Sequence, residues 1–219
     1  MPTLVIAIDG PSGAGKGTVA RAIAAELGFS HVDSGAMYRA VGWKALEAGI
    51  PLDDEDRVAE VASRSRITVS AGHTTIDGTD VTRAIRTPEI DRAAAAVARL
   101  PGVRAVLVQR QRQLGELGGI VMEGRDIGTV VFPDADVKIY LDAAPEERAR
   151  RRATDSAHSG PVAVADVATA LTARDELDRT RAVSPLYAAA DAIIVDTTGK
   201  AIDEVVKDVL TIVRLKTGR

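Results

Sequence analysis

Short apolar runs alternate with amphipathic segments along most of this 219-residue chain. The runs are of the kind found in strands buried on both faces of a parallel sheet, and they span residues 4–9, 120–123, 137–141 and 192–195. Apolar residues at helical spacing predict helices at residues 19–27, 36–48, 101–117, 145–154, 164–181 and 201–215. This alternation predicts an α/β fold in which helices flank a parallel sheet.

Two segments fit the alternation poorly. Residues 66–81 read as short antiparallel strands joined by turns, which indicates an insertion beside the main sheet. Residues 154–160 are polar and follow a strongly basic helix. We therefore expect a single domain, 1–219, that carries an insertion for a second ligand at about 34–100 and a lid at about 145–172.

A glycine-rich turn lies between the first strand and the first helix, in the order that a phosphate-binding P-loop requires. Its glycines let backbone N–H groups converge, and the helix N-terminus adds partial positive charge. The alternative, a turn without a ligand, is disfavoured because both flanking elements are as expected. The motif predicts binding of a nucleoside polyphosphate such as ATP by Gly10, Pro11, Ser12, Gly13, Ala14, Gly15, Lys16, Gly17 and Thr18.

Two positions of this motif carry specific expectations. The ammonium group of Lys16 can reach the β- and γ-phosphates as a point charge. Gly17 stands where Ser or Thr is usual, so a hydroxyl contact to Mg²⁺ is assigned to Thr18. Glu123, at the end of another predicted strand, is a candidate for contacting Mg²⁺ through water.

Composition excludes several classes of protein. The formal net charge of -3 argues against binding of nucleic acid polymers, which favours a basic surface. The chain contains no cysteine, so it has no disulfide framework and no thiolate chemistry. It has no apolar run near 18 residues and no signal pattern, and we expect a cytoplasmic protein without a membrane partner.

Polar residues after the predicted strands suggest a second ligand. Ser34, Tyr38 and Arg39 begin one helix and suit a phosphate or a polar base, although an ordinary helix cap with a solvent-facing arginine remains an alternative. Arg125 and Asp126 follow a strand at its carboxyl end, where parallel sheets bind ligands. A turn stabilised by their ion pair is the other interpretation.

Arginines on the later helices can be interpreted in two ways. Arg174, Asp178 and Arg181 share one helix face, which is either a solvated ladder of ion pairs or a ligand-facing surface. The basic helix could place arginines in a lid, or pair them with Glu146 and Glu147 at the surface. Its candidates are Arg148, Arg151 and Arg152.

Together these segments resemble the bacterial cytidylate kinases, a branch of the nucleoside monophosphate kinases. The resemblance covers nearly the whole chain and is carried by residues 10–18, 33–39, 85–90, 101–104, 124–129 with 132–135, and 174–181. The P-loop and the segment Gly-Arg-Asp-Ile-Gly-Thr with its Phe-Pro-Asp-Ala tail are specific in combination. The resemblance implies transfer of the γ-phosphoryl group of ATP to CMP or dCMP, with Mg²⁺, by a monomer.

The resemblance also implies roles for individual residues. Cytosine would be read by Ser34, Arg104 and Asp126, and the acceptor phosphate would be held by Tyr38, Arg39, Arg125 and Arg181. Arg174 and Asp178 would meet the ribose, and catalysis would depend on Lys16, Arg125, Arg181, Arg148 and Arg152. Ala95 departs from the family pattern, in which a serine usually contacts the ribose hydroxyls.

Two alternative functions stay open at this stage. One is a kinase of another monophosphate such as UMP. The other is a P-loop switch protein that signals by binding a nucleotide, as small GTPases do. That class reads guanine with an Asn-Lys-x-Asp segment, and this chain contains no asparagine.

Overall fold

The computed structural model describes residues 4–70, 72–154 and 164–218 of the chain. Its centre is a five-stranded parallel sheet in the order β2-β6-β1-β7-β8. The strands are β1 (Val5–Asp9), β2 (Ser30–Asp33), β6 (Ile120–Glu123), β7 (Val137–Asp142) and β8 (Ile193–Asp196). The predicted parallel sheet is confirmed, and its four predicted strands are all present.

Side chains alternate between the two faces of the sheet, as strand geometry requires. Ile6 and Ile8 of β1 face α1 (Lys16–Leu27) and α8 (Ile202–Thr217), where Val19, Val205 and other apolar residues complete a buried core. On the other face, Ala7 packs with Met122 and Ile127. That face is covered by α5 (Pro101–Gly115) and by η1 (Ile127–Val131), a short π-helix that directly follows the Arg125-Asp126 segment.

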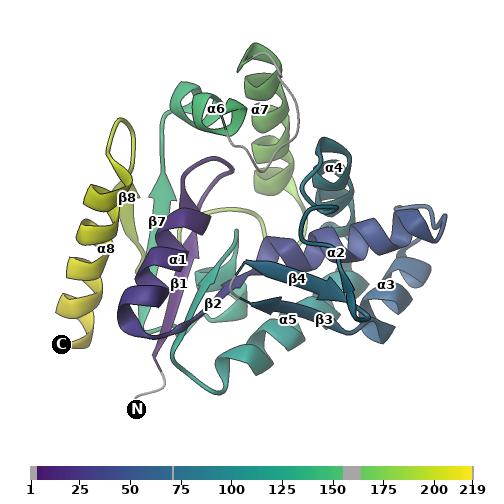
Figure 1. The fold of residues 1–219 in the computed structure, drawn as a ribbon, viewed down its shortest axis with the longest axis horizontal. Coiled ribbons are helices and arrows are strands. Elements are labelled where there is room, and N and C mark those ends of the chain that lie inside the picture. The colour runs from purple at the N-terminus through teal and green to yellow at the C-terminus, as the bar shows by residue number, and fades with distance from the viewer. Residues whose placement is uncertain (1–3, 71, 155–163, 219) are drawn as a thin grey trace.

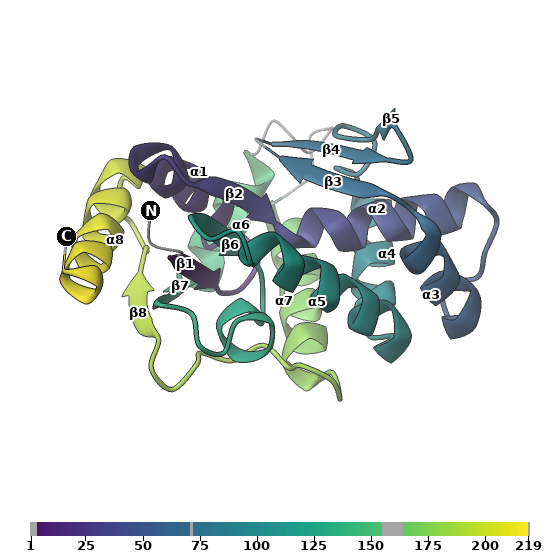
Figure 2. The same cartoon turned by 90° about the horizontal axis from the view of Figure 1, so that it is seen from below.

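A helical region extends from one side of the sheet. It contains α2 (Ser34–Glu47), α3 (Glu55–Arg64), α4 (Pro88–Val97) and part of α5, which enclose a second core around Met37, Val58 and Leu107. A small antiparallel sheet of β3 (Ile67–Ser70), β4 (His73–Ile76) and β5 (Thr79–Asp80) lies along α2 (Figure 2). The predicted antiparallel insertion at residues 66–81 is confirmed.

Two helices, α6 (Pro145–Ala153) and α7 (Val164–Thr180), stand beyond the carboxyl edge of the parallel sheet, with α4 beside α7 (Figure 1). We call α6 and α7 the lid helices. The predicted lid at about 145–172 includes all of α6 and the first part of α7. The polar segment predicted at its centre falls largely on residues 155–163, which lie outside the described residues.

The strand β2 and the helix α3 are additions to the predicted elements. β2 is a short edge strand in which only Val32 is apolar, so it carries no apolar run. α3 begins with Asp54, whose side chain accepts a hydrogen bond from the Arg57 amide at 3.2 Å, and buries only Val58 and Ala62. Both elements depend on packing against neighbours that are distant in the sequence.

Gly10 allows β1 to turn into the P-loop beside β7. Its φ is +145°, and a Cβ atom built there would lie 2.0 Å from the carbonyl oxygen of Leu141. We predict that Gly10→Ala destabilises the protein by more than about 4 kcal/mol or prevents folding, because backbone atoms of two paired strands would have to separate.

Gly49→Ala is the matched control for this substitution. Gly49 also has a positive φ, +63°, but nothing lies within 4 Å of a Cβ atom there, so a cost of about 1–2 kcal/mol is expected. The free energy of unfolding in urea measures both effects. Equal losses in the two variants would show that the contact with Leu141 is not limiting.

Candidate active site

The P-loop is fixed at the carboxyl end of β1 by a buried carboxylate. Asp9 accepts hydrogen bonds from the backbone amides of Ile127 and Gly128, at 2.8 and 2.7 Å. Burial raises the pKa of Asp9 to about 6, against the opposite effect of these two hydrogen bonds. The contact ties the end of β1 to the turn after β6, so that two ligand-binding segments of the sheet share one anchor.

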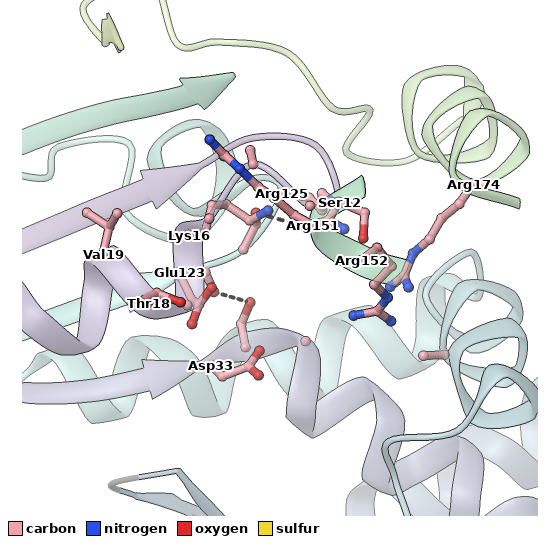
Figure 3. Close-up of a pocket in the computed structure, with 18 of the residues that line it drawn as sticks. Ser12, Lys16, Thr18, Val19, Asp33, Glu123, Arg125, Arg151, Arg152 and Arg174 are labelled. Atoms are coloured by element: carbon pink, nitrogen blue, oxygen red, sulfur yellow. Dashed lines mark hydrogen bonds between the residues drawn. The ribbon is translucent and has the colours of Figure 1, made fainter. Parts of the chain in front are cut away.

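Lys16 is the first residue of α1 and is 7% exposed. Its ammonium group donates to the carbonyl oxygen of Pro11 at 2.6 Å, which closes the loop around its own backbone (Figure 3). Burial and the nearby Arg125 guanidinium lower the pKa of Lys16 well below its ordinary value, while Glu123 acts in the opposite direction. A phosphate group at the loop would stabilise the charged form of this lysine.

A cavity of about 1030 Å³ extends from the P-loop to α2, α4 and the lid helices. Its volume lies at the upper end of the range of roughly 300–1,000 Å³ that is typical of ligand pockets. The residues predicted from the sequence that line it are Ser12, Gly13, Ala14, Gly15, Lys16, Gly17, Thr18, Ser34, Tyr38, Arg39, Arg104, Glu123, Arg125, Asp126, Arg151, Arg152, Arg174, Asp178 and Arg181. The structure therefore brings together residues from both ends of the chain.

One end of the cavity is organised around Asp126. Its carboxylate forms an ion pair with Arg104, and the Arg181 guanidinium lies 3.5 Å from its other oxygen. Arg104 is buried and also donates to the Tyr38 hydroxyl at 3.2 Å. Burial raises the pKa of Tyr38 to about 12, so its hydroxyl stays protonated at neutral pH.

Ser34 completes this end of the cavity. Its hydroxyl donates to the carbonyl oxygen of Glu123 at 2.7 Å, which places the start of α2 against the end of β6. The preceding residue, Asp33, caps the helix by accepting from the Ala36 amide at 3.1 Å. The sequence left two interpretations of this segment, a helix cap and a surface that faces a ligand. The structure has both features in neighbouring residues, because Asp33 caps α2 and Ser34 lines the cavity.

Asp178 organises the face next to the P-loop. The Arg125 Nε atom lies 2.8 Å from its carboxylate, and the Arg181 guanidinium lies 4.0 Å away. Burial alone would raise the pKa of Asp178, but Arg125 and Arg174 hold it below its ordinary value. The helix face of Arg174, Asp178 and Arg181 is turned into the cavity, so the solvated-ladder interpretation of these residues is wrong.

Gly10, Pro11 and Arg148 do not line the cavity with the other predicted residues. Arg148 is buried behind the P-loop, where it donates to the carbonyl oxygens of Ser12 and Ala143, at 3.1 and 3.0 Å, and pairs with Asp175 of α7. In this arrangement Arg148 supports the loop instead of facing a ligand. A basic helix pattern alone does not reveal which arginines turn inward.

Sequence reasoning missed Asp91 and the role of His31. Asp91 of α4 forms ion pairs with Arg39, Arg152 and Arg174. His31 is buried on β2 with its Nε2 atom 3.0 Å from the Glu123 carboxylate. An isolated histidine in the sequence gives no indication of such a contact.

Thr18 and Glu123 lie beside the start of α1 (Figure 3). A Cβ atom at Gly17 would lie 3.1 Å from a Glu123 carboxylate oxygen, so the absence of a side chain there leaves room for that carboxylate. Among the described residues, no group of three or more His, Cys, Asp or Glu side chains is gathered for a metal ion. A metal at this place would need oxygen ligands from a nucleotide and water as well.

The fold and the cavity define a P-loop kinase, in which a phosphate loop and a second ligand site face each other under lid helices. A family model for cytidylate kinase matches residues 6–215, and the chain belongs to that family. A cytidylate kinase of Desulfitobacterium hafniense is 52% identical, over 95% of this chain and 92% of its own length. One from Desulforamulus reducens is 50% identical, over 94% and 95%.

A solved structure supports the fold independently of sequence. Shikimate kinase from Bacteroides thetaiotaomicron superposes with a TM-score of 0.54 at 12% identity, covering 96% of this chain and 98% of that one. At this identity the similarity concerns the fold alone. The predicted family and the predicted class of fold are confirmed.

We predict that Lys16→Ala leaves the protein folded and lowers turnover on the order of 10²-fold or more, because it removes a charge aimed at the transferred phosphoryl group. Arg150→Ala is the control, since Arg150 is exposed and pairs with Glu147 on the same helix at 2.8 Å. Steady-state rates and thermal unfolding of both variants measure the effect. Turnover near that of the parent in a folded Lys16→Ala protein would refute the assignment of the loop.

Proposed function

We propose that this chain transfers the γ-phosphoryl group of ATP to CMP, and to dCMP, giving ADP and the corresponding cytidine diphosphate. The observation that carries the proposal is the cavity that joins the P-loop to the buried Arg104-Asp126 pair. One end suits a nucleoside triphosphate, and the other presents a carboxylate and a guanidinium to a polar base. The family membership supports the same activity.

At the donor end, Gly10 and Pro11 would shape the turn, and the loop residues that line the cavity, Ser12–Thr18, would hold the phosphates of ATP through backbone N–H groups, with Lys16 at the β- and γ-phosphates. At the acceptor end, Asp126 accepts from the exocyclic amine of cytosine, while Arg104 and Ser34 complete the edge of the base. The Tyr38, Arg39, Arg125 and Arg181 side chains hold the acceptor phosphate, and Arg174 with Asp178 meets the ribose.

The acceptor needs no protein base. A nucleoside monophosphate is largely dianionic at neutral pH because its second pKa lies near ~6. Its oxygen attacks the γ-phosphorus in line as the bond to the β-phosphate oxygen breaks, and Lys16, Arg125, Arg152 and Arg181 neutralise charge on the transferred group. The lid helices exclude water, which would otherwise hydrolyse ATP.

Mg²⁺ fits the donor end of this cavity. Thr18 would provide a hydroxyl and Glu123 a carboxylate acting through water, a set that matches the preference of Mg²⁺ for a few protein oxygens and several waters. When bound, the ion neutralises charge on the β- and γ-phosphates. In the same proposal, Glu123 is held in place by His31, whose Nε2 atom lies 3.0 Å away.

The proposal treats the protein as a cytoplasmic monomer that acts on small nucleotides, without a nucleic acid or membrane partner. Within the described part of the chain, no helix has the length and apolar character needed to cross a bilayer.

A coupled assay with ATP and CMP, dCMP, UMP or AMP tests the proposed function. Preferred transfer to UMP or AMP would contradict it.

We predict that Asp126→Asn narrows the preference for CMP over UMP. A carboxylate accepts from the cytosine amine but faces the O4 acceptor of uracil, and such a contact discriminates by about 1–3 kcal/mol. An amide can rotate to donate, while its oxygen still accepts from Arg104. The ratio of kcat/KM for the two acceptors is measured in the parent and the variant, with the exposed Asp134→Asn as the control. An unchanged ratio would show that the base is read elsewhere.

We predict that Ala95→Ser widens the preference for CMP over dCMP, mainly by improving CMP. Ala95 lines the cavity on α4, and a hydrogen bond to a ribose hydroxyl contributes about 0.5–1.5 kcal/mol, or roughly tenfold at most. Ala96→Ser, one position further along α4, is the control. The measurement is kcat/KM for both acceptors. If the ratio does not change, or if dCMP gains as much as CMP, position 95 does not face the ribose.

A further inference from the structure

Three arginines from three helices converge on Asp91 in the first turn of α4. The Arg39 Nε atom of α2 lies 3.0 Å from Asp91 Oδ1, and the Arg174 Nη1 atom of α7 lies 3.2 Å from the same oxygen. Arg152 of α6 pairs with Oδ2. Figure 3 shows Arg152 and Arg174 approaching each other from the two lid helices. Asp91 therefore joins both lid helices to the acceptor side of the cavity.

The three arginines that pair with Asp91 belong to the wall of the cavity. A guanidinium carries five N–H donors in a planar fork, so a side chain that pairs with one carboxylate can also face a second anion. The Arg174 Nε atom is buried and has no hydrogen-bond partner. Arg39, Arg152 and Arg174 all line the cavity, whereas Asp91 does not. Asp91 thus contacts the three side chains from outside the cavity lining, and the buried Nε atom of Arg174 leaves that guanidinium a donor for a phosphate or hydroxyl oxygen.

Electrostatics explain why a carboxylate is needed at this point. Burial and the nearby Arg125 and Arg39 lower the pKa of Arg174 to about 10, and Asp91 is the strongest influence in the opposite direction. Without Asp91, three cations in a partly dehydrated cavity would repel one another and separate. Their separation would move donors away from the positions that an in-line transfer requires.

We infer that Asp91 is a positioning residue for phosphoryl transfer, which sets Arg39, Arg152 and Arg174 in register when the lid helices meet α4. The inference rests on the proposed function, and it adds a residue that acts through the arginines without touching either nucleotide. Ala95, one helical turn further along α4, lines the cavity, so Asp91 lies directly at its margin.

The first test is Asp91→Asn, which keeps the shape of the side chain and removes its charge. We expect kcat for CMP to fall on the order of 10- to 100-fold and KM for CMP to rise, while KM for ATP changes by less than about threefold, because Arg39 and Arg174 contact the acceptor in the proposed function and misplaced donors also weaken the transition state. Glu89→Gln is the control, since it removes the same charge from the same helical turn at an exposed position. A kcat within twofold of the parent in Asp91→Asn overturns the inference.

Two further variants separate positioning from charge and from folding. Asp91→Glu keeps the charge but displaces it by one methylene group, and we expect at least a threefold loss of kcat at an unchanged melting temperature. Activity equal to that of the parent would show that charge alone matters.

The double variant tests whether Asp91 acts through Arg152. Asp91→Asn combined with Arg152→Gln should lose little more kcat than Arg152→Gln alone, and fully additive losses of kcat would contradict action through that arginine. If Asp91→Asn does not fold, Asp91→Glu decides.

The parent enzyme separates failure of this inference from failure of the proposed function. If the parent transfers no phosphoryl group to CMP, the proposed acceptor is wrong. Asp91 is then judged on the hydrolysis of ATP without an acceptor, which Arg152 would support at the transferred phosphoryl group. Slower hydrolysis in Asp91→Asn than in Glu89→Gln supports the inference, and equal rates refute it.

Discussion

Ion pairs between buried arginines and carboxylates hold the two halves of this cavity together. A site for two phosphate-bearing molecules gathers cations, and each buried cation is costly unless a partner satisfies it. Asp126 forms ion pairs with Arg104 and Arg181, Asp178 pairs with Arg125, and Asp91 pairs with three arginines. Because the partners come from helices far apart in the sequence, these pairs also determine how the lid helices sit over the sheet.

The parallel sheet makes this arrangement possible. The carboxyl ends of β1, β2 and β6 are neighbours, so the P-loop, the start of α2 and the Arg125-Asp126 segment leave the sheet at one edge. Asp9 then fixes the distance between two of these segments through the Ile127 and Gly128 amides. The geometry of the site follows from backbone hydrogen bonds first, and side chains complete it.

Local chemistry explains which parts the sequence could predict. The P-loop could be found because its strand, its glycines and its helix are adjacent, and the Arg125-Asp126 segment because it follows an apolar run. Asp91 could not be found, because its three partners are contributed by α2, α6 and α7, and one carboxylate in a helix predicts no such convergence. The strand β2 was missed since its burial depends on pairing with β6, nearly 90 residues later.

In the proposed function, Arg181 would link recognition of the base to the chemistry of transfer. It lies 3.5 Å from Asp126, which is proposed to read cytosine, and 4.0 Å from Asp178, which also pairs with Arg125. Its Nε atom donates to the Ser184 carbonyl oxygen, so the turn after α7 sets its direction. A base that engages Asp126 differently would change the partner of Arg181, and through it the position of a phosphate-binding donor. In the proposed function, selection of the acceptor and acceleration of the reaction would therefore depend on the same small set of ion pairs.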